Sequence, residues 1–105
     1  MSTVKHDVTK ISGIVTVTGG IGIWTLPRGM ADEILMVGCR PAADSAEYDL
    51  YIQDEQDGYD IFRRDGNIGL YSELLTAAVP MWGDNSVYIS GATVDGMYKI
   101  RLIYK

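Results

Sequence analysis

The sequence is poor in the side chains from which most catalytic sites are built. Among its 105 residues it has one cysteine, Cys39, and one histidine, His6. A single cysteine excludes an internal disulfide framework and cannot form a thiolate metal site alone. A histidine that activates a nucleophile must be held in a cleft, whereas His6 lies in a polar stretch at the start of the chain. We therefore expect a non-enzymatic protein with no catalytic residue and no cofactor.

Long apolar runs and clustered basic residues are also missing. No run approaches the roughly 20 apolar residues that a transmembrane helix needs, and residues 1–10 lack the apolar segment of a signal peptide. Nine Lys and Arg residues stand against 14 Asp and Glu residues, giving a net charge of −5. Binding to a nucleic-acid backbone requires a concentrated basic face. We therefore expect a soluble protein, made in the cytoplasm, with no nucleic acid and no membrane as partner.

Strand-forming and turn-forming residues are plentiful. Apolar residues make up 47% of the chain, and there are 12 glycines and seven tyrosines but one phenylalanine. Valine, isoleucine, threonine and tyrosine favour strands, and glycine favours tight turns. A chain of this length forms one domain that can bury a hydrophobic core without covalent staples.

Alternating apolar and polar residues predict seven or eight strands at intervals of about ten residues, a spacing typical of a β-sandwich or barrel. We expect a single all-β domain, an antiparallel sandwich of the jelly-roll type over residues 11–105, preceded by a polar arm over residues 1–10. Turns are predicted at Gly19-Gly20, Asp57-Gly58 and Asp65-Gly66. The expected strands are 11–18, 21–26, 33–39, 48–54, 59–65, 72–80, 85–90 and 97–105.

Two of these runs show how the faces should divide. In the last run, Tyr98 and Ile100 alternate with Lys99 and Arg101, so one face is predicted to be buried and the other cationic. The run 72–80 could begin as a helical turn, but Pro80 favours an edge strand. Trp24 and Cys39 lie in apolar runs, and we expect both in the core.

The acidic stretch from Asp44 to Asp60 is the most conspicuous polar feature. With Gly58 at the sixth position of an EF-hand loop, the twelfth position falls on Arg64 rather than on the required glutamate. A looser calcium site at Asp54, Asp57 and Asp60 and a glycosidase carboxylate pair are the remaining alternatives. A solvated hairpin tip explains the same residues more simply, so we expect no metal site.

Several segments together resemble small phage virion accessory proteins, the β-sandwich proteins that decorate or cement capsids. The resemblance covers the chain from Ile11 onward and lies in pattern and size. The segments that carry it are ISGIVTVTG, ADEILMVGCRP, YDLYIQDEQDGYDIFRRDG and DGMYKIRLIYK.

The resemblance implies a structural protein on the capsid surface of a virion, with the major capsid protein as partner and a dimer or trimer as the functional unit. The expected contact residues are Lys5, His6 and Lys10 in the arm, Trp82 in a loop, and Lys99 and Arg101 on the last strand. The alternative is a carbohydrate-binding or receptor-binding module of a phage tail or fibre, with Trp82 and nearby tyrosines as the binding platform.

Overall fold

The computed structural model describes residues 9–26, 33–56, 58–81 and 84–105. This part of the chain forms eight β-strands and no helix, and therefore contains no helix that could cross a membrane. The strands are β1 (Thr9–Val17), β2 (Gly22–Thr25), β3 (Glu33–Arg40), β4 (Glu47–Asp54), β5 (Asp60–Ile68), β6 (Tyr71–Pro80), β7 (Asn85–Ser90) and β8 (Gly96–Tyr104).

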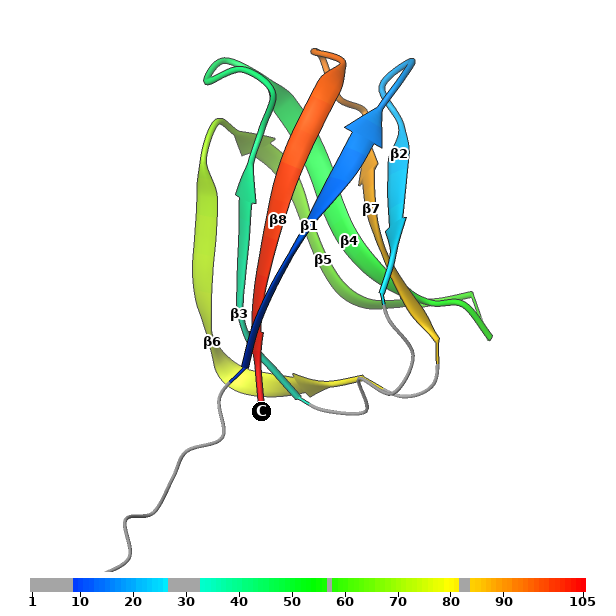
Figure 1. The fold of residues 1–105 in the computed structure, drawn as a ribbon, viewed down its shortest axis with the longest axis vertical. Coiled ribbons are helices and arrows are strands. Elements are labelled where there is room, and N and C mark those ends of the chain that lie inside the picture. Colours follow the sequence, from blue (N-terminus) through cyan, green and yellow to red (C-terminus); the bar gives the residue numbers. More distant parts are fainter. Residues whose placement is uncertain (1–8, 27–32, 57, 82–83) are drawn as a thin grey trace, which may run out of the picture.

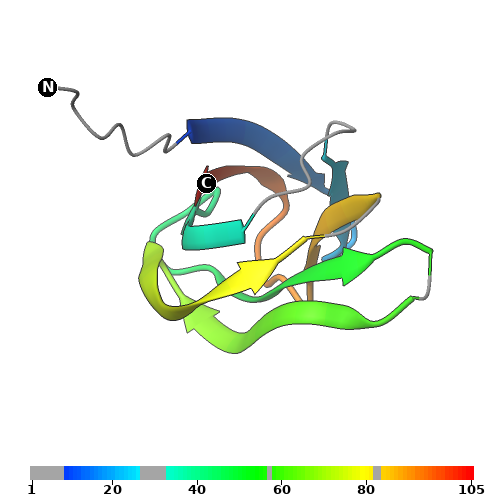
Figure 2. The same ribbon diagram turned by 90° about the horizontal axis from the view of Figure 1, so that it is seen from below.

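The strands form two four-stranded sheets that face each other (Figures 1 and 2). One sheet has the order β1-β8-β3-β6 and the other the order β2-β7-β4-β5, with every neighbouring pair antiparallel. Six of the seven connections between successive strands pass from one sheet to the other, and β4–β5 is the one pair of successive strands that are neighbours in the same sheet. This is the double-sheet arrangement of a jelly roll, so the predicted fold class is confirmed.

The core lies between the sheets and comes from the alternation visible in the sequence. Tyr48, Leu50 and Ile52 of β4 are buried, as are Tyr98 and Ile100 of β8. The Tyr48 and Tyr98 rings meet edge to face at 5.4 Å. Cys39 is buried as predicted, and burial raises the pKa of its thiol to about 11. A neutral, buried thiol acts as a small apolar side chain.

Trp24 is half-buried at one side of the core rather than central to it. Its ring lies over Gly13 of β1, where a built Cβ would come within 2.1 Å of a ring carbon. The glycine thus makes room for an indole from the facing sheet. The prediction that residues 72–80 form an edge strand is confirmed, since β6 pairs with β3 alone.

The first strand begins inside the segment 1–10 that was predicted to be an arm. Strand β1 begins at Thr9, and Lys10 is already paired with Ile103 of β8. The chain pattern alone did not show this because pairing with the distant C-terminal strand extends β1. Lys5 and His6 lie outside the described residues.

The predicted turn at Asp65-Gly66 is wrong. Both residues lie within β5, where they form a bulge between the pairs Leu50–Arg64 and Tyr48–Asn67. Gly66 has φ 69° and donates its N–H to Asp49 Oδ1 at 2.9 Å. A glycine with positive φ suits a bulge as well as a turn, and the pairing with β4 decides between them.

Candidate functional site

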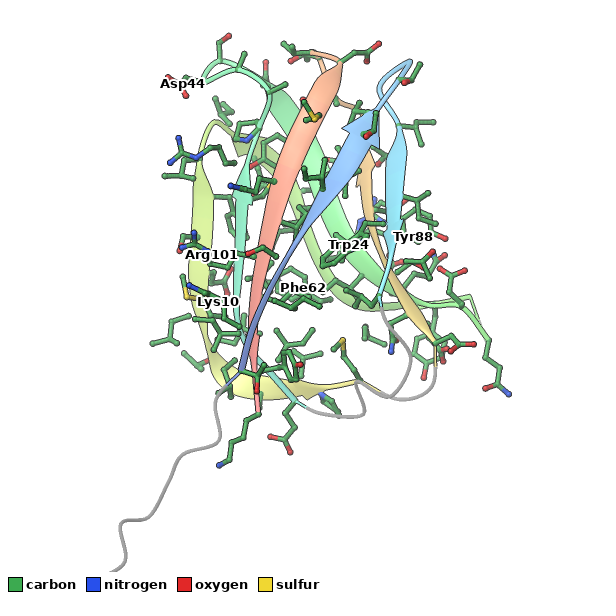
Figure 3. All side chains as sticks on the ribbon, viewed as in Figure 1. Lys10, Trp24, Asp44, Phe62, Tyr88 and Arg101 are labelled. Carbon is green, nitrogen blue, oxygen red and sulfur yellow. The ribbon has the colours of Figure 1, made fainter. Side chains whose placement is uncertain are left out.

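The solvent-facing side of sheet β1-β8-β3-β6 gathers basic and apolar side chains (Figure 3). Strand alternation and register fix its membership, because directly paired residues point to the same side. We call this surface the cationic face. Its residues are Lys10, Ser12, Ile14, Thr16, Met97, Lys99, Arg101, Ile103, Met36, Gly38, Arg40, Ser72 and Leu74.

No acid lies among these residues. Glu33, at the start of β3, is an exposed acid of the same sheet, and its backbone pairs with that of Lys105. Lys10, Arg40, Lys99 and Arg101 make no ion pair within the described part of the chain. Lys99 is paired directly opposite Arg40 in the register of β8 and β3. Like charges directly opposite each other destabilise a sheet. A carboxylate supplied by a partner would remove that repulsion.

Large apolar side chains are interspersed with these cations. Ile14, Met97 and Leu74 are between 49% and 76% exposed, and Leu70, just before β6, is exposed to a similar degree. Single exposed apolar residues are common on protein surfaces, whereas several on one sheet face indicate an interaction site. The cationic face therefore combines apolar contact area with unneutralised charge.

A shallow hollow lies in the middle of this face. It has a volume of about 190 Å³ and is lined by Met36, Gly38, Arg40, Leu70, Ser72, Lys99 and Arg101, with Cys39 and Tyr71 contributing as well. Gly38 lies buried at the floor of the hollow and places no side chain between Arg101 and Ser72, its neighbours across the sheet. A built Cβ at Gly38 meets no atom closer than 3.6 Å.

The opposite surface, on sheet β2-β7-β4-β5, carries a row of stacked side chains. Tyr51 and Tyr88 are parallel, with ring centroids 5.0 Å apart, and the Arg63 guanidinium lies 4.6 Å from the centroid of Tyr51. Ile23 is paired with Tyr88 at the other end of the row. We call these four residues the tyrosine ladder. Because Tyr51 is stacked between Tyr88 and Arg63, its ring faces are not open to a sugar ring.

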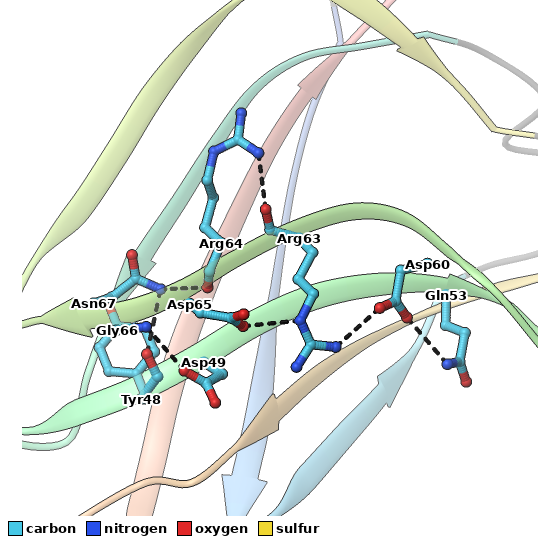
Figure 4. Close-up of polar contacts among 9 residues, drawn as sticks. All are labelled: Tyr48, Asp49, Gln53, Asp60, Arg63, Arg64, Asp65, Gly66 and Asn67. Carbon is cyan, nitrogen blue, oxygen red and sulfur yellow. Dashed lines mark hydrogen bonds and ion pairs between the residues drawn. The ribbon is translucent and has the colours of Figure 1, made fainter.

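Arg63, the arginine of the tyrosine ladder, is neutralised within the chain. Arg63 binds Asp60 at 2.9 Å and Asp65 at 2.8 Å (Figure 4). Arg64 pairs with the buried Leu50 and so points to the other side of β5. It donates to both carboxylate oxygens of Glu73 at 2.8 Å, linking β5 to β6 of the facing sheet. Hydrogen bonds from Arg64 and from the Tyr71 hydroxyl lower the pKa of Glu73 to about 2. The two ion pairs of Arg63 therefore neutralise the charge of the tyrosine ladder within the chain.

In the described part of the acidic hairpin, the carboxylates of Asp54, Glu55 and Asp60 have partners. Asp54 Oδ1 accepts the Gln56 N–H at 3.0 Å, and Asp60 accepts from Arg63 and from Gln53. Glu55 accepts a hydrogen bond from the Tyr88 hydroxyl at 2.8 Å. No group of three metal-ligating side chains occurs among residues 9–26, 33–56, 58–81 and 84–105. Asp57, the third acid of the calcium alternative, lies outside them.

The structure brings three of the six predicted contact residues together. Lys10, Lys99 and Arg101 share the cationic face, while Lys5, His6 and Trp82 lie outside the described residues. The sequence reasoning missed Arg40 and the hollow at Gly38. The run 33–39 is apolar on both faces and gave no signal for them, and the pairing of β3 with β8 was needed to place Arg40 beside Lys99.

Comparison with known proteins identifies no family for this chain. No protein-family model and no curated protein matches the chain. One similar solved structure is a carbohydrate-binding module, CBM36, in complex with calcium and xylotriose, at 12% identity and TM-score 0.39 over 100% of this chain and 92% of the module. Another is the virus-like particle of the extra small virus of the giant freshwater prawn Macrobrachium rosenbergii, at 14% identity and TM-score 0.38 over 99% and 82% of the respective chains. The class of protein defined here is a small β-sandwich.

Proposed function

We propose that this chain is a non-enzymatic structural protein of a virion, a phage capsid decoration or cement protein located on the outer shell. The observation that carries the proposal is the cationic face. It joins exposed apolar side chains to four cations that have no acidic partner in the described part of the chain. Such a surface fits an acidic protein surface, because the apolar contacts contribute affinity and the charges contribute register.

The proposed mechanism is reinforcement through shared contacts. A decoration protein stabilises a shell by burying surface across neighbouring capsomers, and several linked copies engage symmetry-related sites together. Linking copies raises the effective concentration of each further contact. In this mechanism the cationic face serves assembly, while the arm and the Trp82 loop contact the major capsid protein.

The test is co-sedimentation with shells assembled from the major capsid protein encoded with this chain. We expect the wild-type protein to saturate the shells. Removal of residues 2–8 leaves the paired residues of β1 in place and should abolish occupancy. Unchanged occupancy would discard the arm as a contact element, and absence of wild-type binding would discard the capsid function.

The alternative, a carbohydrate-binding or receptor-binding module, is separated by a glycan array. A decoration protein should give no signal on it. Strong binding of one glycan class, lost on substitution of Trp82, would replace the proposed function with the alternative.

A further inference from the structure

We propose that the occupant of the cationic face is the β4–β5 hairpin tip of a second copy of this chain. We call the residues Asp54–Gln56 and Gly58–Asp60 the acidic tip. This inference rests on the proposed function, since it names which protein covers the face. The contact is heterologous: the face of one copy receives the tip of the next.

The acidic tip has the chemistry that the cationic face lacks. It carries the carboxylates of Asp54 and Glu55, which have no basic partner in the described part of the chain, beside Tyr59, which is 57% exposed. The hollow at Gly38 offers three basic side chains beside apolar Leu70 and Met36. An aromatic ring can enter the hollow while the neighbouring carboxylates meet the cations. Tyrosine and arginine are also the residue types that dominate binding energy at protein interfaces.

The acidic tip is preorganised for docking. The Asp54 N–H donates to the Tyr59 carbonyl at 2.9 Å, and the Gly58 N–H donates to the Asp54 carbonyl at 2.7 Å. The Glu55 N–H donates to the Asp84 carbonyl at 3.0 Å, which ties the tip to the segment before β7. A rigid element loses less conformational entropy on binding than a mobile one.

The two surfaces cannot meet within one copy. The tip extends from sheet β2-β7-β4-β5 beyond the body of the sandwich in both views (Figures 1 and 2), whereas the cationic face lies on the other sheet. Contact between them therefore joins different copies. A head-to-tail contact of this kind closes into a ring when its rotation allows and otherwise extends as a chain.

The experiment compares two variants whose changes are confined to exposed side chains. The face variant carries Lys99→Glu and Arg101→Glu, and the tip variant carries Tyr59→Ser and Glu55→Lys. Glu47→Lys, at the far end of β4 from the tip, is the charge-matched control. Analytical ultracentrifugation at low and high salt measures the mass of each purified protein, and thermal unfolding verifies that each is folded.

We expect the wild type and the Glu47→Lys control to self-associate at low salt and to dissociate as salt screens the charges. The face variant and the tip variant should each be monomeric alone. Their equimolar mixture should form a dimer with one copy of each, because one supplies an intact face and the other an intact tip. No symmetric face-to-face or tip-to-tip contact gives this result.

A wild type that stays monomeric at low salt, or a tip variant that self-associates as well as the wild type, would overturn the inference. Shell binding is measured separately and keeps the two proposals distinguishable. Wild-type occupancy of shells with no dimer in the mixture would refute the tip contact and leave the capsid function standing. A mixed dimer without shell binding would support the tip contact and refute the capsid function.

Discussion

The two outer surfaces of this sandwich differ in whether their basic side chains have acidic partners within the chain. On the tyrosine ladder side, Arg63 is held by the carboxylates of Asp60 and Asp65, and Tyr51 is stacked between neighbours. On the cationic face, Arg40 and Lys99 stand opposite each other, without an acid between them. The first surface is complete in the isolated chain, whereas the second would gain stability from an acidic partner. Interaction surfaces are therefore better recognised by missing partners than by the number of charges.

The largest expected effect on stability distinguishes two glycines of sheet β1-β8-β3-β6, Gly13 on its inner side and Gly38 on its outer side. Gly13→Ala drives a methyl group into the Trp24 ring and should lower the free energy of unfolding by about 1 to 3 kcal/mol, the usual cost of overpacking. Gly38→Ala should be neutral or stabilising by up to about 1 kcal/mol, because the hollow has room and alanine restricts the unfolded chain. Urea unfolding of both variants measures the difference. Equal losses would show that the hollow at Gly38 is not open.

A second prediction concerns the tyrosine ladder. Tyr51→Ala removes the ring between Tyr88 and Arg63 and should cost about 1 to 2 kcal/mol of stability, from lost burial and stacking. Tyr51→Phe keeps the ring and is the control, with stability expected near the wild type. Urea unfolding measures both variants. An alanine variant as stable as the phenylalanine variant would mean that the ladder does not support the sheet.

A third, smaller effect depends on pH. The pKa of Glu73 falls from its ordinary 4.5 to about 2 in the folded state, so its contribution is present above pH 4.5 and is lost as pH falls through 2. The Glu73→Gln variant should therefore have a free energy of unfolding about 0.5 to 1 kcal/mol below that of the wild type at neutral pH, as expected for a well-aligned but solvent-accessible ion pair. The difference in free energy of unfolding between the variant and the wild type should decrease as the pH falls from 4.5 to 2. A gap independent of pH would contradict the ion-pair explanation.

The smallest expected effect is neutralisation on the cationic face. Lys99→Gln should change the free energy of unfolding of the monomer by no more than about 0.5 kcal/mol, with the sign toward stabilisation because it relieves repulsion with Arg40. Thermal unfolding at high salt, where the monomer is expected, measures it. A clear loss of stability would show that Lys99 has a partner within its own chain, and the contrast between the two surfaces would disappear.

Much of the fold was predictable because alternation of side chains is a local property. The faces of β4 and β8 were correct residue by residue, and the edge position of β6 followed from Pro80. The errors arose where a partner strand changes the meaning of a local signal. Asp65-Gly66 suits a tight turn and a bulge equally well, and pairing with β4 makes it a bulge. Thr9 and Lys10 look like arm residues until β8 lies beside them.

The candidate site was less predictable than the fold. The sequence placed Lys99 and Arg101 on one side of their strand, but it contained no indication that Arg40 and Gly38 lie next to them. The tyrosine ladder was missed for the same reason, because Tyr51 and Tyr88 belong to strands separated by two others in the sequence.

By itself the sequence determined that the chain forms short two-faced strands with a buried apolar side and a polar side, since strand periodicity depends on neighbouring residues alone. Only the tertiary structure decided which strands are neighbours, and so which charges are paired and which are left for a partner. The reason is that pairing joins residues remote in the chain, and register, set by packing of the whole core, fixes which side chains meet.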